Sequence, residues 1–264
     1  MSASDPPPPI KRLGQNFLID PNIVRKIVAL AELRPGDHVL EIGPGRGILT
    51  GALSQSAGRV TAVEIDPRLH AYLESRKAEL PNVELVCEDA LAYPVGNLPM
   101  GTVVVANLPY YISAPLLFRL LGQHDRFPRM VLMLQDEVAD RLVANPGGSD
   151  YGVLSVMAQY AAEIIKSFRV SPQCFRPRPE VASAVVILRA HTRRKMNQQE
   201  EAAFRTLVKA AFAHRRKTLI NSLRDEGYVL HPLAKTLQRL DIAPTRRAET
   251  LSVEDFIRLA IALG

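Results

Sequence analysis

The fold of this chain is decided by the segment His38-Val39-Leu40-Glu41-Ile42-Gly43-Pro44-Gly45-Arg46-Gly47. Its first five residues are mostly apolar and predict a short buried strand, and the glycines that follow predict a tight turn into a helix. Glycine at Gly43 and Gly45 lets a ligand approach the backbone, and the free amide hydrogens at a helix start favour an anionic group. The spacing Gly-x-Gly-x-Gly differs from the Gly-x-Gly-x-x-Gly of dinucleotide-binding folds. We therefore predict a strand, a glycine turn and a helix that hold a ligand.

The same alternation continues from residue 20 to about residue 170 and predicts a parallel sheet covered by helices. Asp20-Pro21 and Asp66-Pro67 each begin a helix, with aspartate as the N-cap and proline at the first helical position. The expected parallel strands are 38–42, 60–63, 83–86 and 102–106. Two further strands, 164–170 and 184–188, should form an antiparallel pair at the edge of the sheet.

Polar residues stand at the ends of these strands, where open parallel sheets bind their ligands. Glu64 follows Gly43 by 21 residues and can accept both ribose hydroxyls of an adenosine. Asp89 can accept from an adenine amino group. A helix cap or a turn explains either carboxylate taken singly, but four successive strands that end in Gly, Glu, Asp and Asn favour a nucleotide site.

The fourth strand leads into Asn107-Leu108-Pro109-Tyr110. The Asn107 side-chain oxygen and the Leu108 carbonyl can each accept one hydrogen of an adenine amino group. Tyr110 can stack on a base that has rotated out of its helix. An ordinary turn explains the same residues, since Asn and Pro are common in turns. In this context the motif favours methyl transfer to a nucleic-acid base.

Length and composition allow one large domain or a main domain with an appendage. The chain has 264 residues, 47% of them hydrophobic, and no stretch is typical of a membrane span. Two cysteines and six histidines lack the spacing of metal ligands, so we expect no metal. Residues 1–10 contain four consecutive prolines and no signal-peptide core, so we expect a disordered leader on a cytoplasmic protein.

The net charge of +6 lies entirely in the C-terminal part of the chain. Residues 1–190 hold 19 Lys and Arg against 19 Asp and Glu, whereas residues 191–264 hold 14 against 8. Basic clusters in this part suit contact with nucleic-acid phosphates, although solvated helix faces carry such charges as well. The clusters are His191-Thr192-Arg193-Arg194-Lys195, His214-Arg215-Arg216-Lys217 and Arg246-Arg247.

Two more motifs are Lys11-Arg12-Leu13-Gly14-Gln15-Asn16-Phe17-Leu18 and Phe175-Arg176-Pro177-Arg178-Pro179-Glu180-Val181-Ala182-Ser183-Ala184-Val185. With 39–50 and 107–110 they make the chain resemble the ribosomal RNA adenine dimethyltransferases of the KsgA family over nearly all of residues 11–264. The resemblance implies that the cofactor is S-adenosylmethionine and that Gln15 and Phe17 help to close its pocket. It places Asn16, Leu18, Gly43, Glu64, Asp89 and Asn107 at the family's cofactor-binding positions.

Two positions leave alternatives open. The family usually has Gly before the acidic residue of the third strand, whereas this chain has Glu88 before Asp89, so either carboxylate can face the adenine. Phe175 lies in a loop stiffened by Pro177 and Pro179, where its ring can form a second face for a stacked base. For an isolated Phe, a place in the core beneath the loop is the simpler interpretation, and the resemblance favours base contact.

The expected fold is α/β, a Rossmann-like S-adenosylmethionine-dependent methyltransferase sheet with an antiparallel edge hairpin and a small C-terminal α-helical domain. After the leader, the methyltransferase domain should span 11–190. Apolar residues at helical spacing predict a helical RNA-binding domain over 191–264.

The resemblance implies dimethylation of the N6 amino groups of two adjacent adenosines. They lie in a hairpin near the 3′ end of small-subunit (16S) ribosomal RNA, and the reaction is linked to small-subunit biogenesis. The expected reaction is direct methyl transfer without a covalent enzyme intermediate or a dedicated base. The expected partner is that RNA in an immature 30S particle, with no membrane and no DNA, and we expect a monomer.

Three alternatives stay open at this point. The first is a related enzyme of the macrolide-resistance type, which methylates one large-subunit adenosine. The second is an assembly or transcription factor that binds RNA on a methyltransferase fold without turnover. The third is a nicotinamide dehydrogenase, which the glycine spacing and the motif at Asn107 disfavour.

Overall fold

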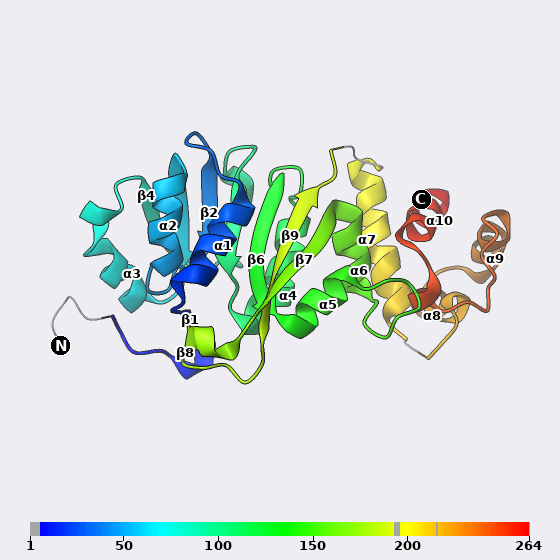
Figure 1. Ribbon diagram of the computed structural model, residues 1–264. Helices are drawn as coiled ribbons and strands as arrows, with labels where there is room; N and C mark the ends of the chain where they lie inside the picture. Colours follow the sequence, from blue (N-terminus) through cyan, green and yellow to red (C-terminus); the bar gives the residue numbers. More distant parts are fainter. Residues whose placement is uncertain (1–5, 193–195, 215, 264) are drawn as a thin grey trace. The chain divides into compact units, whose positions relative to one another are not determined.

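The computed structural model describes residues 6–192, 196–214 and 216–263 (Figure 1). The chain forms two compact units, one of residues 6–139 and 162–190 and the other of residues 140–161 and 191–263. Residues 140–161, which the sequence analysis assigned to the first domain, thus group with the C-terminal part. The reason is that α6 (Val153–Ala161) packs against α7 (Gln198–Phe212) and α10 (Val253–Leu263).

A seven-stranded sheet forms the centre of the first unit, with strand order β4-β3-β2-β5-β6-β9-β7 (Figure 1). Neighbouring strands from β4 to β6 are parallel, and β9 is antiparallel to both β6 and β7. The predicted parallel strands and the antiparallel edge pair are therefore confirmed. The bounds are β2 His38–Ile42, β3 Arg59–Glu64, β4 Val83–Cys87, β5 Val103–Asn107, β6 Arg129–Gln135, β7 Ala162–Val170 and β9 Ser183–Ala190.

The sequence analysis missed β6, which lies between β5 and β9. Its five central residues are all buried. A strand that is covered on both faces has a continuous apolar run without alternation, and such a run also fits a buried helix. The omission left the antiparallel pair without its attachment to the parallel part of the sheet.

Helices of the first unit begin where the sequence predicts them. The carboxylate of Asp20 accepts a hydrogen bond from Asn22 N at 2.8 Å, and that of Asp66 accepts one from Arg68 N at 3.0 Å. Each therefore satisfies an amide that has no partner within its helix. The helices are α1 Pro21–Ala31, α2 Ile48–Ser56, α3 Pro67–Glu74, α4 Ser113–Leu121 and α5 Asp136–Val143.

Two segments far apart in the sequence form a small second sheet. Strand β1 (Phe17–Leu18) pairs antiparallel with β8 (Phe175–Arg176). The hydrogen bond from Ile19 N to Cys174 O, at 2.9 Å, extends this pairing. The N-terminal motif and the proline-rich motif are thus joined at the backbone, which the sequence alone did not predict.

The second unit is helical in its described part. Besides α6, α7 and α10 it contains α8 (Leu219–Asp225) and α9 (Leu230–Arg239). Its core includes the ring pair Tyr160–Phe204, with centroids 4.7 Å apart. None of the helices in the described ranges has the length and apolar character that a bilayer crossing requires. Short 3₁₀ turns complete both units, namely Lys11–Leu13, Lys77–Glu79, Val95–Asn97, Tyr110–Ile112, Pro172–Cys174 and Ala248–Thr250.

We expect Gly47→Ala to lower the free energy of unfolding by about 1–2 kcal/mol, the cost of a side chain in the left-handed region. Gly47 has a φ of 81° at the start of α2. A Cβ there would also lie 2.6 Å from Leu73 Cδ2. Urea denaturation measures the change. Gly36→Ala is the control, since an added Cβ at Gly36 has no such neighbour within 4 Å. Equal midpoints for the two variants would contradict the argument.

Candidate functional site

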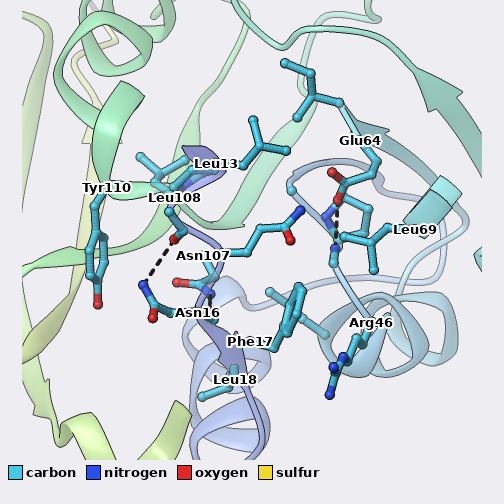
Figure 2. Close-up of a pocket in the computed structure, with 18 of the residues that line it drawn as sticks. Leu13, Asn16, Phe17, Leu18, Arg46, Glu64, Leu69, Asn107, Leu108 and Tyr110 are labelled. Atoms are coloured by element: carbon cyan, nitrogen blue, oxygen red, sulfur yellow. Dashed lines mark hydrogen bonds between the residues drawn. The ribbon is translucent and has the colours of Figure 1, made fainter. Parts of the chain in front are cut away.

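A pocket lies at the carboxyl ends of β2, β3 and β5, where the sequence predicts a ligand site (Figure 2). The register places these ends level, because Ile42 is paired with both Val63 and Ala106. The next residue of each strand therefore reaches the same edge. Of the predicted site residues, those that line the pocket are Gln15, Asn16, Leu18, Gly43, Gly45, Glu64, Asn107, Leu108, Pro109 and Tyr110.

The glycine loop is tied to the end of β3 through Glu64. Glu64 Oε2 accepts from Gly45 N at 3.0 Å, and Oε1 accepts from Asp66 N at 2.9 Å. Gly43 and Gly45 have φ values of 68° and 57°, the left-handed region that favours glycine. Burial raises the pKa of Glu64, and the two backbone donors act against that rise. The loop and this carboxylate therefore form one preorganised wall of the pocket.

Asn107 is the last residue of β5, and its side-chain amide is oriented by the N-terminal segment. Its Nδ2 donates to Asn16 O at 3.3 Å. The Oδ1 atom has no recorded hydrogen bond to another described residue. An amide whose nitrogen is engaged and whose oxygen is available can accept a hydrogen from a ligand.

The next residues of the motif are also held in place. Leu108 is buried, and its backbone N donates to Met133 O at 2.9 Å. The Tyr110 hydroxyl is hydrogen-bonded to Ser183 Oγ at 2.7 Å, which restrains the ring at the pocket wall. Burial raises the pKa of Tyr110, so the phenol stays neutral near pH 7.

An N-terminal strap, which we define as residues 7–18, crosses the pocket. Gln15 Nε2 donates to Asp66 Oδ2 at 3.0 Å, and Gln15 Oε1 accepts from Ile10 N at 2.7 Å. Hydrogen bonds from Arg68 hold the pKa of Asp66 at about 2, so the strap is anchored on a charged carboxylate. Pro7 O and Pro8 O accept from Arg46 and Arg68. The expectation of a disordered leader is thus corrected for residues 7–10.

Glu41 is a pocket residue that the sequence analysis overlooked. Its side chain lines the pocket, and the residue is only 1% exposed. Burial raises the pKa of Glu41 to about 8, the nearby Thr50 hydroxyl acts in the opposite direction, and the Glu64 charge adds to the rise. Its Oε2 atom is buried without a hydrogen-bond partner. A carboxylate inside an otherwise apolar strand, directly before a glycine loop, was the available signal.

Asp89 does not line the pocket. Its Oδ1 accepts from Leu91 N at 2.8 Å, so it makes the turn that the simpler interpretation predicts. Its charge is nevertheless felt nearby: the pKa of Tyr111 is raised by burial first and then by the charges of Asp89 and Glu64. A contact between Asp89 and an adenine stays a prediction.

The expectation that Phe175 faces a base is corrected by the structure. Its ring is completely buried and packs in the core with Leu18, Val170 and Val185. The pairing of β8 with β1 turns this side chain inward, because Phe175 lies directly opposite Leu18. Phe175 is therefore a core residue beneath the strap.

Acidic neighbours accompany several of the C-terminal basic residues. His214 lies 3.3 Å from Glu226, Lys217 pairs with Asp225, and Arg246 lies 3.7 Å from Asp255. Such pairing reduces the charge available to an external anion. Residues Arg193, Arg194, Lys195 and Arg215 of the predicted clusters lie outside the described residues. In the described ranges no group of three or more His, Cys, Asp or Glu could hold a metal ion.

The sheet order, the glycine loop and the pocket define a Rossmann-like methyltransferase. Two solved structures share the fold over almost the whole chain. A dimethyladenosine transferase from Plasmodium falciparum is 28% identical, with a TM-score of 0.81 over 92% of this chain and 95% of that one. The 23S rRNA methyltransferase ErmE is 28% identical, with a TM-score of 0.71 over 94% of this chain and 99% of that one.

Sequence relatives narrow the class to one family. The profile described as "Ribosomal RNA adenine dimethylase" matches residues 10–263. The Ribosomal RNA small subunit methyltransferase A of Moorella thermoacetica is 45% identical over 97% of this chain and 92% of its own length. The protein of the same name from Geobacter metallireducens is 43% identical over 96% and 94%. The chain belongs to the ribosomal RNA adenine dimethylase family.

We expect Glu41→Gln to flatten the loss of stability at alkaline pH. The pKa of Glu41 rises from 4.5 to about 8 on folding, so its contribution is complete below about pH 4.5 and is lost as the pH rises through about 8. Gln is neutral at every pH. At pH 8.5 the variant should therefore have the higher Tm, by about 2–4 °C per kcal/mol recovered.

Thermal unfolding from pH 6 to 8.5 measures this effect. Glu74→Gln, at an exposed position of α3, is the control and should follow the wild type. If Glu41→Gln and the wild type lose Tm in parallel, Glu41 is not held neutral by burial.

Proposed function

We propose that this protein transfers methyl groups from S-adenosylmethionine to the N6 amino groups of two adjacent adenosines. We place them in a hairpin near the 3′ end of small-subunit (16S) ribosomal RNA. The observation that carries the proposal is the meeting of two sets of groups in one pocket: the glycine loop with Glu64, and the motif from Asn107 to Tyr110. The first set suits a nucleoside cofactor, and the second suits an adenine amino group.

The pocket residues fit S-adenosylmethionine, which supplies a methyl group on a positively charged sulfur. The buried, unpartnered Oε2 of Glu41 suits a cationic ligand, because a positive charge would stabilise its ionised form. Gly43 and Gly45 leave room beside the backbone, and Glu64 stands at the end of β3 to accept ribose hydroxyls. In this proposal Gln15, Asn16 and Leu18 close the pocket, and Asp89 accepts from the cofactor's adenine.

The target adenine would be held by the motif at the end of β5. Asn107 Oδ1 and the Leu108 carbonyl accept the two amino hydrogens, which orients the nitrogen and stabilises the positive charge that develops on it. Tyr110 stacks on the base, and its bond to Ser183 fixes the ring beforehand. A methylated, positively charged amine is acidic enough to lose its proton to water, so no dedicated base is needed.

Small-subunit RNA is favoured over the large-subunit alternative by the relatives. The small-subunit methyltransferase of Moorella thermoacetica is 45% identical, against 28% for the 23S rRNA methyltransferase ErmE. A binding protein without turnover and a nicotinamide dehydrogenase both fit the preorganised Asn107 less well. We further propose that the enzyme acts in the cytoplasm as a monomer on an immature 30S particle, not on DNA, and that its C-terminal helices contact the RNA.

The test is to supply labelled S-adenosylmethionine with immature small subunits and, separately, with large subunits, and to map modified bases by mass spectrometry. We expect dimethyladenosine in the 3′-terminal fragment of the small-subunit RNA only. Labelling of a large-subunit adenosine, or of neither RNA, would refute the proposed substrate.

We expect Asn107→Ala to lower kcat about 100-fold or more, by analogy with the loss of one preorganised polar group in other active sites. RNA affinity should change little, because most contacts of a protein with RNA are made outside the base pocket. Single-turnover methylation and subunit binding measure the two effects. Equal losses of turnover and affinity would count against the proposed role.

We also expect the affinity for S-adenosylmethionine to rise with pH between about 6 and 8. A bound cation lowers the pKa of Glu41 from about 8, so binding releases a proton. The dissociation constant should fall by at most about tenfold per pH unit, the limit for one coupled proton. Calorimetry measures the dependence, which Glu41→Gln should abolish. Adenosine, which lacks the charged methionine part, should bind independently of Glu41 ionisation.

A further inference from the structure

A groove of about 500 Å³ lies on the first unit beside helices α1 and α2, which contact each other. We name it the α1–α2 groove. It is open to solvent and shares Arg46 and Ile48 with the cofactor pocket, so the two hollows are continuous. The residues that give it its character are Arg25, Arg46, Gly47, Gly51, Gln55 and Arg76.

The α1–α2 groove carries positive charge that its own lining does not neutralise. Three arginines line it, and no Asp or Glu is among the lining residues. Arg25 is hydrogen-bonded to the neutral side chain of Asn22. Arg46 donates to Pro7 O at 3.3 Å and lies over the Phe17 ring at 4.5 Å. Within the described residues only Arg76 has a recorded carboxylate partner, Glu79 at 2.6 Å.

Two further features suit an anion. The N-terminal end of α2, at Gly47 and Ile48, belongs to the lining, and backbone amides at a helix start favour negative charge. The guanidinium group matches a phosphate with two parallel hydrogen bonds and is more weakly hydrated than an ammonium. A run of phosphates is therefore the ligand that this lining recognises best.

Gly51 points to the same conclusion by a different argument. It lies inside α2, where glycine is less favourable than alanine because it loses more conformational freedom on folding. Its φ is not in the left-handed region, and an added Cβ would have no non-neighbouring atom within 4 Å. Packing thus gives no reason for glycine here. The missing side chain does, however, deepen the α1–α2 groove.

We propose that the α1–α2 groove binds the phosphodiester backbone of the RNA substrate beside the target adenosines. The inference rests on the proposed function, since the pocket that adjoins the groove is where the target base would enter. Arg25 and Arg46 contact phosphates, and Gly51 allows the backbone to approach α2. Such contacts set the position of the RNA and do not select the base.

The first test compares Arg25→Ala with Arg34→Ala. Arg34 is exposed in the loop before β2, at the opposite end of that strand from the pocket. Affinity for immature small subunits is measured at several salt concentrations. Loss of one phosphate contact should lower the slope of log affinity against log salt by about 0.7–0.9, which is about a sixfold weakening at 100 mM relative to 1 M salt. Arg34→Ala should leave the slope unchanged.

The second test fills the α1–α2 groove without adding charge. Gly51→Ala and Gly51→Leu should raise the Tm, because both residues favour helix more than glycine does. Both should weaken subunit binding, Leu more than Ala. Ser54→Ala is the matched control: it also favours α2, but Ser54 does not line the groove. It should raise the Tm and leave subunit affinity unchanged.

The outcomes separate the inference from the function on which it rests. Dimethylation by the wild type, with weakened binding by Arg25→Ala and by both Gly51 variants, supports the groove. Dimethylation by the wild type with subunit affinities equal to those of the controls overturns the groove and leaves the function intact. A wild type that binds S-adenosylmethionine but methylates neither subunit overturns the function itself, whatever the variants do.

Discussion

The register of β2 between β3 and β5 is the constraint on which the rest of the structure depends. Ile42 stands opposite Val63 on one side and Ala106 on the other, so Gly43, Glu64 and Asn107 reach one edge together. A shift by one residue would turn every side chain of a strand to the other face of the sheet. The apolar runs that these strands bury on both faces hold the register in place.

From that edge the pocket is assembled by groups that restrain one another. Glu64 holds the glycine loop through Gly45, and Asp66 holds the strap through Gln15. The strap in turn orients the Asn107 amide through Asn16 O. The acceptor for the base and the cover of the cofactor are therefore coupled: a movement of the strap would also release the Asn107 side chain. Preorganisation of this kind is what a reaction controlled by alignment requires.

The distribution of charge in space differs from its distribution along the chain. Equal numbers of acidic and basic residues in 1–190 suggested that the first domain was electrostatically neutral. In the structure Arg25 and Arg46 gather in the α1–α2 groove, away from carboxylates, whereas Lys217 and Arg246 of the C-terminal clusters lie beside acids. A count of charges along a sequence cannot separate these cases, because side chains from distant residues neutralise one another only after folding.

The sequence by itself determined the alternation of strands and helices, the Asp20 and Asp66 caps and most of the pocket residues. Periodicity, capping and strand-end position are local properties that survive without knowledge of distant contacts. Tertiary structure alone decided that Phe175 is a core residue, that Glu41 is a buried acid of the pocket and that residues 140–161 group with the C-terminal helices. Each of these depends on which distant segment covers a side chain, and burial, pKa and charge compensation all follow from that long-range packing.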